Sequence, residues 1–139
     1  MSWFTSTVFA VILFTLWGFM NGVAVKYVNP YTALIFSSFG YLLSGIVILG
    51  IRGFQLELSL NGAIAGILLG LGTGFGGFFV LRAMSQVDSN VSVVIAITSI
   101  YPLGVLILSY FFLAETITFF KLIGFVLAII GIIILCICS

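Results

Sequence analysis

Residues 119–138 have the sequence FFKLIGFVLAIIGIIILCIC, and this stretch decides the class of fold. Its only charged residue is Lys121, in the first turn, and no polar side chain occurs between Leu122 and Leu135. A helix needs about 20 apolar residues to cross the ~30 Å hydrocarbon core of a bilayer. The stretch has this length and composition, so it predicts a transmembrane helix.

The rest of the chain repeats this pattern. Residues 3–25, 31–51, 62–81 and 91–113 form four more apolar runs of similar length. Charged residues make up 5% of the chain, whereas a soluble domain carries about a quarter. We therefore predict an all-α integral membrane protein, a bundle of five transmembrane helices. The short connections predict that neighbouring helices run antiparallel.

Composition also excludes several classes of function. The net charge is +1 and histidine is absent, so we expect no nucleic-acid partner and no histidine-based metal site. The sequence contains no nucleophile–base pair, metal-ligand cluster or phosphate-binding loop, so we expect no enzyme activity, metal or cofactor. Cys136 and Cys138 lie at the end of the last apolar run and are interpreted as membrane-compatible filler. Lipid is an expected partner.

Helix boundaries are marked by capping residues. Asn29 and Pro30 form an N-cap followed by a proline at the first helical position. Asn90-Val91-Ser92 has the pattern of a glycosylation acceptor, but it opens a membrane helix and is interpreted as a cap. Thr116 and Thr118 are candidate caps for the fifth helix.

The basic residues are evenly divided between the two sides of the membrane. With five spans, Arg52 and Lys121 share the side of the N-terminus, whereas Lys26 and Arg82 lie on the other side. Orientation follows the difference in Lys and Arg between the sides, and here that difference is zero. Either a single amine or a biosynthetic factor sets the orientation, or the chain inserts both ways. We predict the second, a dual topology.

Polar side chains recur along one face of three helices. The simple explanation for serine and threonine is a hydrogen bond to the backbone one turn earlier. Stripes on three helices together instead predict a shared internal cavity. The residues expected to line it are Trp17, Asn21, Ser37, Tyr41, Thr98, Ser99 and Tyr101.

Pro102 lies in the middle of the fourth run. It has no N–H for the Thr98 carbonyl, and its ring favours a kink. A carbonyl freed inside a bilayer must face protein or water, and transporters place sites at such interruptions. We therefore assign Pro102 to the predicted cavity as well.

Glycines are spaced four residues apart in the third run. Such a ridge allows close approach of a neighbouring helix. The predicted helix-packing glycines are Gly62, Gly66, Gly70 and Gly74, together with Gly124 and Gly131 in the last run.

Several of these features together resemble the EamA-like domain of the drug/metabolite transporter superfamily. They are Trp17-Gly18 followed by Lys26, the mid-helix Pro102, and the segment 113–116 (LAET), which is similar to that family's L-G-E-x-hydrophobic-T. The resemblance covers nearly the whole chain, as a single domain over residues 1–139. The chain departs from it at Phe36, where an arginine often follows the proline of the second helix.

The resemblance implies one five-helix repeat of a ten-helix inverted-repeat transporter. A second copy inserted the opposite way would complete it, so we expect an antiparallel homodimer that transports small metabolites or amphiphilic molecules by alternating access. The alternatives are a non-transporting membrane protein (an assembly partner or a lipid scramblase or flippase) and an exporter resembling small multidrug resistance proteins. We expect a multi-pass protein located in the plasma membrane of a prokaryote.

Glu115 is the remaining candidate. No acidic or basic residue lies deep in any predicted helix, so a proton relay at the midplane is not expected. The family places a glutamate just past the fourth helix, and Glu115 occupies that position. Its role is either ion coupling or a surface pair with Lys121 or Arg52.

Overall fold

The computed structural model describes residues 3–56, 59–86 and 90–137, and in these segments it is helical with short connections. The helices are α1 (Trp3–Tyr27), α2 (Pro30–Ile51), α3 (Leu60–Met84), α4 (Val91–Thr98), α5 (Tyr101–Phe112) and α6 (Phe119–Ile137). By length and composition, α1, α2, α3, the α4–α5 pair and α6 are able to cross a membrane. The five-span, all-α prediction is confirmed.

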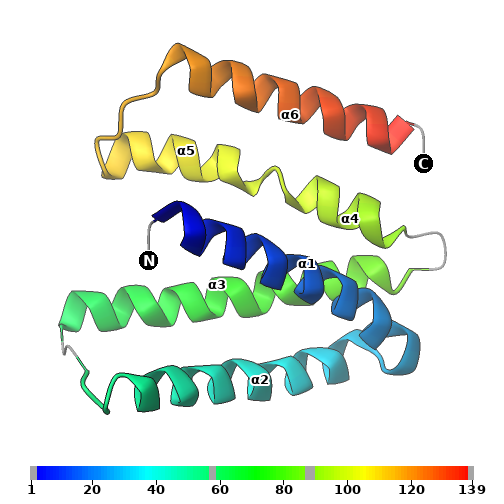
Figure 1. Cartoon of the computed structure of the whole chain (residues 1–139). Helices are drawn as coiled ribbons and strands as arrows, with labels where there is room; N and C mark the ends of the chain where they lie inside the picture. The colour runs from blue at the N-terminus through cyan, green and yellow to red at the C-terminus, as the bar shows by residue number, and fades with distance from the viewer. Residues whose placement is uncertain (1–2, 57–58, 87–89, 138–139) are drawn as a thin grey trace. The chain divides into compact units, whose positions relative to one another are not determined.

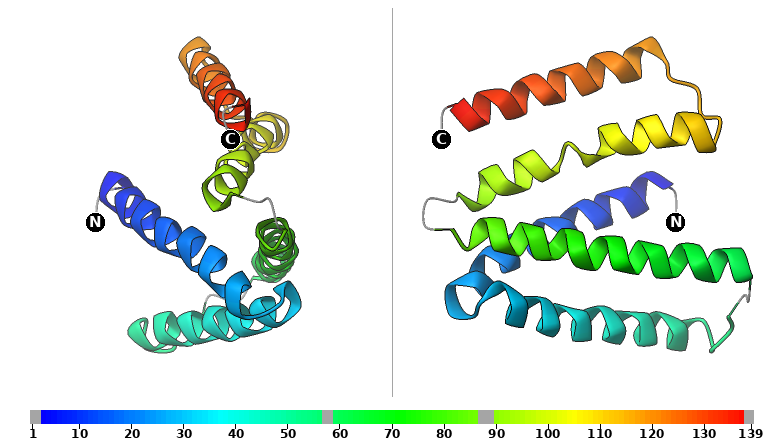
Figure 2. Two further views of the ribbon diagram at one scale, coloured as in Figure 1. Left: turned by 90° about the vertical axis from the view of Figure 1, so that its right-hand side faces the viewer. Right: turned by 180° about the vertical axis from the view of Figure 1, so that it is seen from behind.

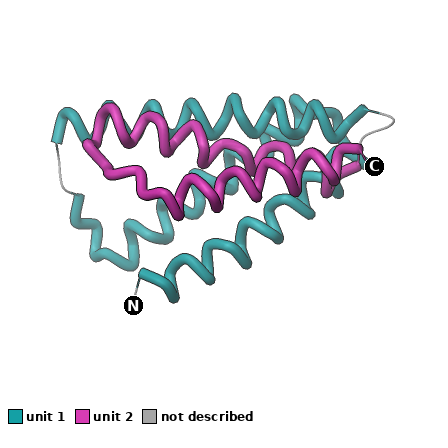
Figure 3. The backbone as a smooth tube through the Cα atoms, turned by 90° about the horizontal axis from the view of Figure 1, so that it is seen from above, with its two compact units in different colours: residues 1–87 teal, residues 88–139 magenta. Residues whose placement is uncertain are grey.

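The chain divides into two compact units, residues 1–87 and 88–139 (Figure 3). In the first unit, α2 packs on α3, and α1 contacts both. In the second unit, α4 contacts α6.

The core of the first unit lies at one end of its helices. Its buried residues come from the second half of α1, the first turn of α2 and the last turns of α3. They are Gly18, Asn21, Gly22, Ala33, Val80, Leu81 and Met84. From this end α1 and α2 diverge (Figure 2, left). Most apolar side chains beyond the core are exposed, as a lipid-facing surface requires.

Side-chain caps fix the start of four helices, because the first N–H groups of a helix have no partner inside it. Asn29 accepts from the Thr32 N–H at 2.8 Å with Pro30 at the first position, and Asn90 accepts from the Ser92 N–H at 3.1 Å. Thr118 accepts from the Lys121 N–H at 3.4 Å. The caps predicted at Asn29, Asn90 and Thr118 are confirmed.

The predicted helix boundaries differ from the observed ones mainly in α3. This helix starts at Leu60 because Ser59 caps it, accepting from the Gly62 N–H at 3.5 Å. It continues past Arg82 to Met84, since a cation in the last turn is favoured by the helix dipole. The first helix likewise continues to Tyr27. Cys138, the last residue of the predicted fifth helix, lies outside the described residues.

The fourth span is interrupted rather than kinked. We expected one helix over residues 91–113, but α4 ends at Thr98 and α5 begins at Tyr101. Pro102 lies in the first turn of α5, where a missing N–H costs nothing. The Ser99 and Ile100 N–H groups turn back to carbonyls of α4, including Ile95 and Ile97. The proline therefore starts a new helix instead of bending an old one.

Two helix ends use left-handed residues. After α2, Gly53 has φ of 65° and Phe54 has φ of 60°, and the Phe54 N–H donates to the Leu49 carbonyl at 3.0 Å. After α5, Ala114 has φ of 52°, and the Glu115 N–H donates to the Ser109 carbonyl at 3.2 Å. Glycine adopts this left-handed conformation without an energetic penalty, whereas alanine adopts it at a cost.

We predict that Ala114→Gly stabilises the protein by up to about 1 kcal/mol. Relief of the left-handed strain is worth roughly 1–2 kcal/mol, and the greater freedom of glycine in the unfolded chain offsets about half of it. The free energy of unfolding in mixed detergent micelles measures the change. Ala128→Gly, inside α6, is the control and should destabilise by about 1 kcal/mol. Equal destabilisation by both substitutions would contradict the assigned backbone strain.

Candidate functional site

A cleft of about 480 Å³ lies in the first unit, mainly between α1 and α2. Its lining comes from α1, α2, the connection between them and one residue of α3. The residues are Trp17, Met20, Asn21, Ala24, Val28, Ala33, Phe36, Ser37, Gly40, Tyr41, Ser44 and Leu81. Four predicted cavity residues, Trp17, Asn21, Ser37 and Tyr41, thus line a single cleft.

A side-chain hydrogen bond joins the two helices that form the cleft. Trp17 Nε1 donates to the Tyr41 hydroxyl oxygen at 3.2 Å. Both aromatic rings line the cleft, Trp17 from α1 and Tyr41 from α2. The bond links α1 and α2 beyond their buried junction.

Asn21 lies one turn after Trp17 on α1. The residue is 8% exposed, and its Nδ2 atom is buried without a hydrogen-bond partner in the described chain. An unsatisfied buried donor of this kind costs about 1–3 kcal/mol. Asn21 is therefore the most costly polar group of the cleft in this structure.

The serine hydroxyls of the cleft are satisfied locally. Ser37 Oγ donates to the Leu34 carbonyl, and Ser44 Oγ donates to the Tyr41 carbonyl, each at 2.8 Å. This is the simple explanation considered for serine in a membrane helix. The serines therefore make the cleft polar without requiring a ligand.

The other predicted cavity residues surround the interruption in the second unit. Thr98 and Ser99 donate their hydroxyl hydrogens to the Ile95 carbonyl at 2.9 and 2.8 Å. Pro102 offers no N–H to the Thr98 carbonyl, and Tyr101 is exposed. These four residues are adjacent in the fold. Their union with the first unit's cleft in a single cavity stays a prediction.

Five of the six predicted packing glycines face open space within the described chain. A Cβ added at Gly66, Gly70 or Gly74 would meet no atom within 4 Å, and the same holds for Gly124 and Gly131. Gly62 faces only the capping Ser59. Their role in helix packing stays a prediction.

A different glycine pair is buried in the first unit. Gly18 and Gly22 of α1 are buried on either side of Asn21. Their four-residue spacing is the small-residue pattern that favours close helix contact. This pair was missed by sequence analysis, although its spacing is readable in the sequence.

Sequence analysis also missed the apolar part of the cleft. Phe36 lies next to Ser37 and one turn before Gly40, so its helical position already places it near the polar stripe of α2. Met20 and Leu81 could not be assigned in this way, because their place depends on how α1 and α3 pack.

Glu115 and Lys121 flank the connection between α5 and α6. Lys121 Nζ donates to the Thr116 carbonyl at 3.2 Å, and the described chain shows no ion pair between Lys121 and Glu115. Glu115 is exposed. The surface pair with Lys121 that we weighed is therefore not formed in this structure, and the coupling role of Glu115 stays a prediction.

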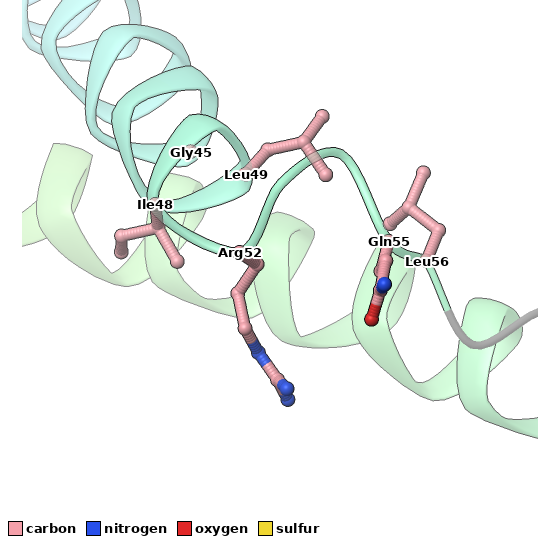
Figure 4. A pocket seen from close by; sticks show the side chains of 6 residues that line it. All are labelled: Gly45, Ile48, Leu49, Arg52, Gln55 and Leu56. Carbon is pink, nitrogen blue, oxygen red and sulfur yellow. The ribbon is translucent and has the colours of Figure 1, made fainter.

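A second hollow, of about 560 Å³, lies at the end of α2 (Figure 4). It is lined by Gly45, Ile48, Leu49, Arg52, Gln55 and Leu56. It belongs to the helix end and the following turn, so we place it at the membrane surface and do not assign it to the cavity.

The sequence profile of the EamA-like transporter family matches residues 1–137. The chain belongs to this family. No significant match was found among curated proteins or solved structures. With its five candidate spans, this member of the EamA-like family is a multi-pass membrane protein, a transporter of the drug/metabolite superfamily. The fold expected from the resemblance, one five-helix repeat, is confirmed.

We predict a coupling energy of about 0.6 kcal/mol between Trp17 and Tyr41, the average measured for side-chain hydrogen bonds between membrane helices. Trp17→Phe removes the donor and Tyr41→Phe removes the acceptor. Unfolding in mixed micelles of the two single variants and the double variant gives the coupling. Tyr110→Phe, which alters a tyrosine of α5, is the control and should combine additively with Trp17→Phe. Additivity of the Trp17 and Tyr41 variants would contradict the bond.

Proposed function

We propose that two copies of this chain, inserted in opposite orientations, form a transporter that works by alternating access. Its cargo consists of small metabolites or amphiphilic molecules. The observation that carries the proposal is the cleft between α1 and α2. It holds unsatisfied and interhelical polar groups inside segments that are otherwise apolar. Polar groups inside membrane-spanning segments are costly and commonly mark substrate paths.

The interruption of the fourth span supports the proposal of a cargo-binding site with alternating access. Transporters built from inverted repeats bind cargo near discontinuous helices, where freed backbone groups face a cavity. The gap at Ser99 and Ile100 provides such a point. An inverted partner would supply the second repeat.

The charge distribution supports the opposite orientation of the partner. Lys26 and Arg82 occupy the last turns of α1 and α3, which begin on the same side and end on the other. Arg52 follows α2, and Lys121 lies in the first turn of α6. Each side of a five-span chain therefore receives two basic residues, and this balance favours neither orientation.

We predict that cysteines at Ser37 and Ser99 react with a membrane-impermeant thiol reagent. Both are placed in a background without Cys136 and Cys138. The cavity must be reached by water at some stage of the cycle, so both positions should be labelled. Ile46→Cys, on the opposite face of α2 from Ser37, is the control and should be protected by lipid. Protection of Ser37→Cys and Ser99→Cys under all conditions would favour a non-transporting protein.

We predict that a C-terminal reporter is active on both sides of the membrane. Paired reporters, each active in one compartment, measure the two populations. Gln55→Lys with Leu56→Lys adds charge beside Arg52 and should shift the C-terminus outward, because the side with more lysine stays in the cytoplasm. Ser85→Lys with Gln86→Lys is the matched control and should shift it inward. A single orientation that ignores both changes would end the dual-topology proposal.

A further inference from the structure

The cleft between α1 and α2 holds one buried hydrogen-bond donor that has no partner in the described chain. Asn21 Nδ2 is buried without a partner. The Tyr41 hydroxyl accepts from Trp17 at 3.2 Å, and Tyr41 is 45% exposed, so it is not a second buried unpaired donor. Unpaired buried donors are rarer in proteins than under-used acceptors, which carry two lone pairs. Asn21 Nδ2 is therefore a buried donor that lacks an acceptor.

The remaining lining does not supply a partner for Asn21. Ser37 and Ser44 donate their hydrogens to backbone carbonyls, and neither of their oxygens accepts from Asn21 Nδ2. The other lining residues are apolar side chains or glycine, and no Lys, Arg, Asp or Glu is among them. An ion entering such a site loses hydration without gaining a counter-charge. A neutral acceptor loses much less.

We propose that the cleft binds uncharged molecules that combine an apolar body with a carbonyl-type acceptor oxygen, and that Asn21 Nδ2 donates to that oxygen. This inference rests on the proposed function, since it names the class of cargo. The apolar body packs against Phe36, Met20 and the face of Trp17. The volume of about 480 Å³ is in the usual range of small-molecule sites.

The aromatic residues of the cleft could instead attract cationic ligands, so the preferred charge of the ligand tests the proposal. Trp17, Phe36 and Tyr41 are aromatic residues in the lining, and aromatic faces attract cations. If this attraction dominated, the cleft would prefer ammonium compounds, which have no acceptor for Asn21. The two possibilities predict opposite orders of affinity.

The test uses binding to the purified full chain. The protein has two tryptophans, so Trp3→Phe leaves Trp17 as the only fluorescent indole, inside the cleft. The probes share one ring: N,N-dimethylcyclohexanecarboxamide, the corresponding protonated amine N,N-dimethyl(cyclohexylmethyl)ammonium, and cyclohexanecarboxylate. We expect the carboxamide to bind about tenfold more tightly than either ion, the effect of one net hydrogen bond. Equal or tighter binding of the ammonium compound would overturn the proposal.

Asn21→Leu, made in the Trp3→Phe background, removes the donor and keeps a similar volume. We expect carboxamide affinity to fall about tenfold with little change for the ammonium compound. Asn61→Leu, on α3 and outside the cleft, is the matched control and should leave the affinity unchanged. Carboxamide binding that is unaffected by Asn21→Leu would overturn the proposal. If Asn21→Leu does not fold, the order of the three probes on the Trp3→Phe chain still decides.

Phe36→Arg provides a test of the charge argument. A guanidinium in the lining supplies the missing counter-charge, so this variant should bind cyclohexanecarboxylate more tightly than the carboxamide. Unchanged preference would contradict an uncharged cleft as the reason for excluding ions.

Failure of this proposal and failure of the proposed function are distinguishable. Asn21-dependent carboxamide binding without thiol labelling at Ser37 and Ser99 would support the ligand class and remove transport. Labelling at both positions with a preference for the ammonium compound would keep transport and remove the ligand class.

Discussion

The structure depends on one constraint: inside a bilayer each backbone N–H and C=O needs a partner within the protein. Long helices satisfy it over most of the chain, and capping side chains such as Asn29 and Asn90 extend it to the helix ends. At the interruption between α4 and α5 the pairing of backbone groups is least complete. There the helix must be restarted by Pro102, and the Thr98 carbonyl is left without its usual N–H. The cost of keeping this interruption supports the role in transport that we propose for the region.

A second consequence concerns packing. Lipid tails are as apolar as leucine, so little hydrophobic free energy drives membrane helices together. In the first unit, α1, α2 and α3 meet where α1 presents Gly18 and Gly22. Beyond this junction α1 and α2 diverge (Figure 2, left), and the Trp17–Tyr41 hydrogen bond links them. A cleft between two helices that share one junction can change its width with little loss of buried apolar contact.

Sequence analysis predicted the number of spans, their approximate limits and three caps, because length, hydropathy and capping chemistry are local properties. It placed Trp17, Asn21, Ser37 and Tyr41 on stripes, but stripes do not say which helices meet. The contact of Trp17 with Tyr41 depends on how α1 crosses α2, and this is a property of packing. The same reason explains the glycines. Spacing alone favoured Gly66, Gly70 and Gly74, whereas the buried pair is Gly18 and Gly22.

The hydrogen-bond pattern separates polar residues that only tolerate the membrane from those that can recognise a ligand. Ser37, Ser44, Thr98 and Ser99 place their hydrogens on their own helix, so removing a ligand costs them nothing. Asn21 has no such local partner, since its amide nitrogen is buried without an acceptor. A cost of about 1–3 kcal/mol is retained there. The same cost is recovered whenever an acceptor arrives, and lipid tails cannot provide one. An isolated amide in an otherwise self-satisfied cleft thus rejects acyl chains and selects molecules that carry an acceptor oxygen.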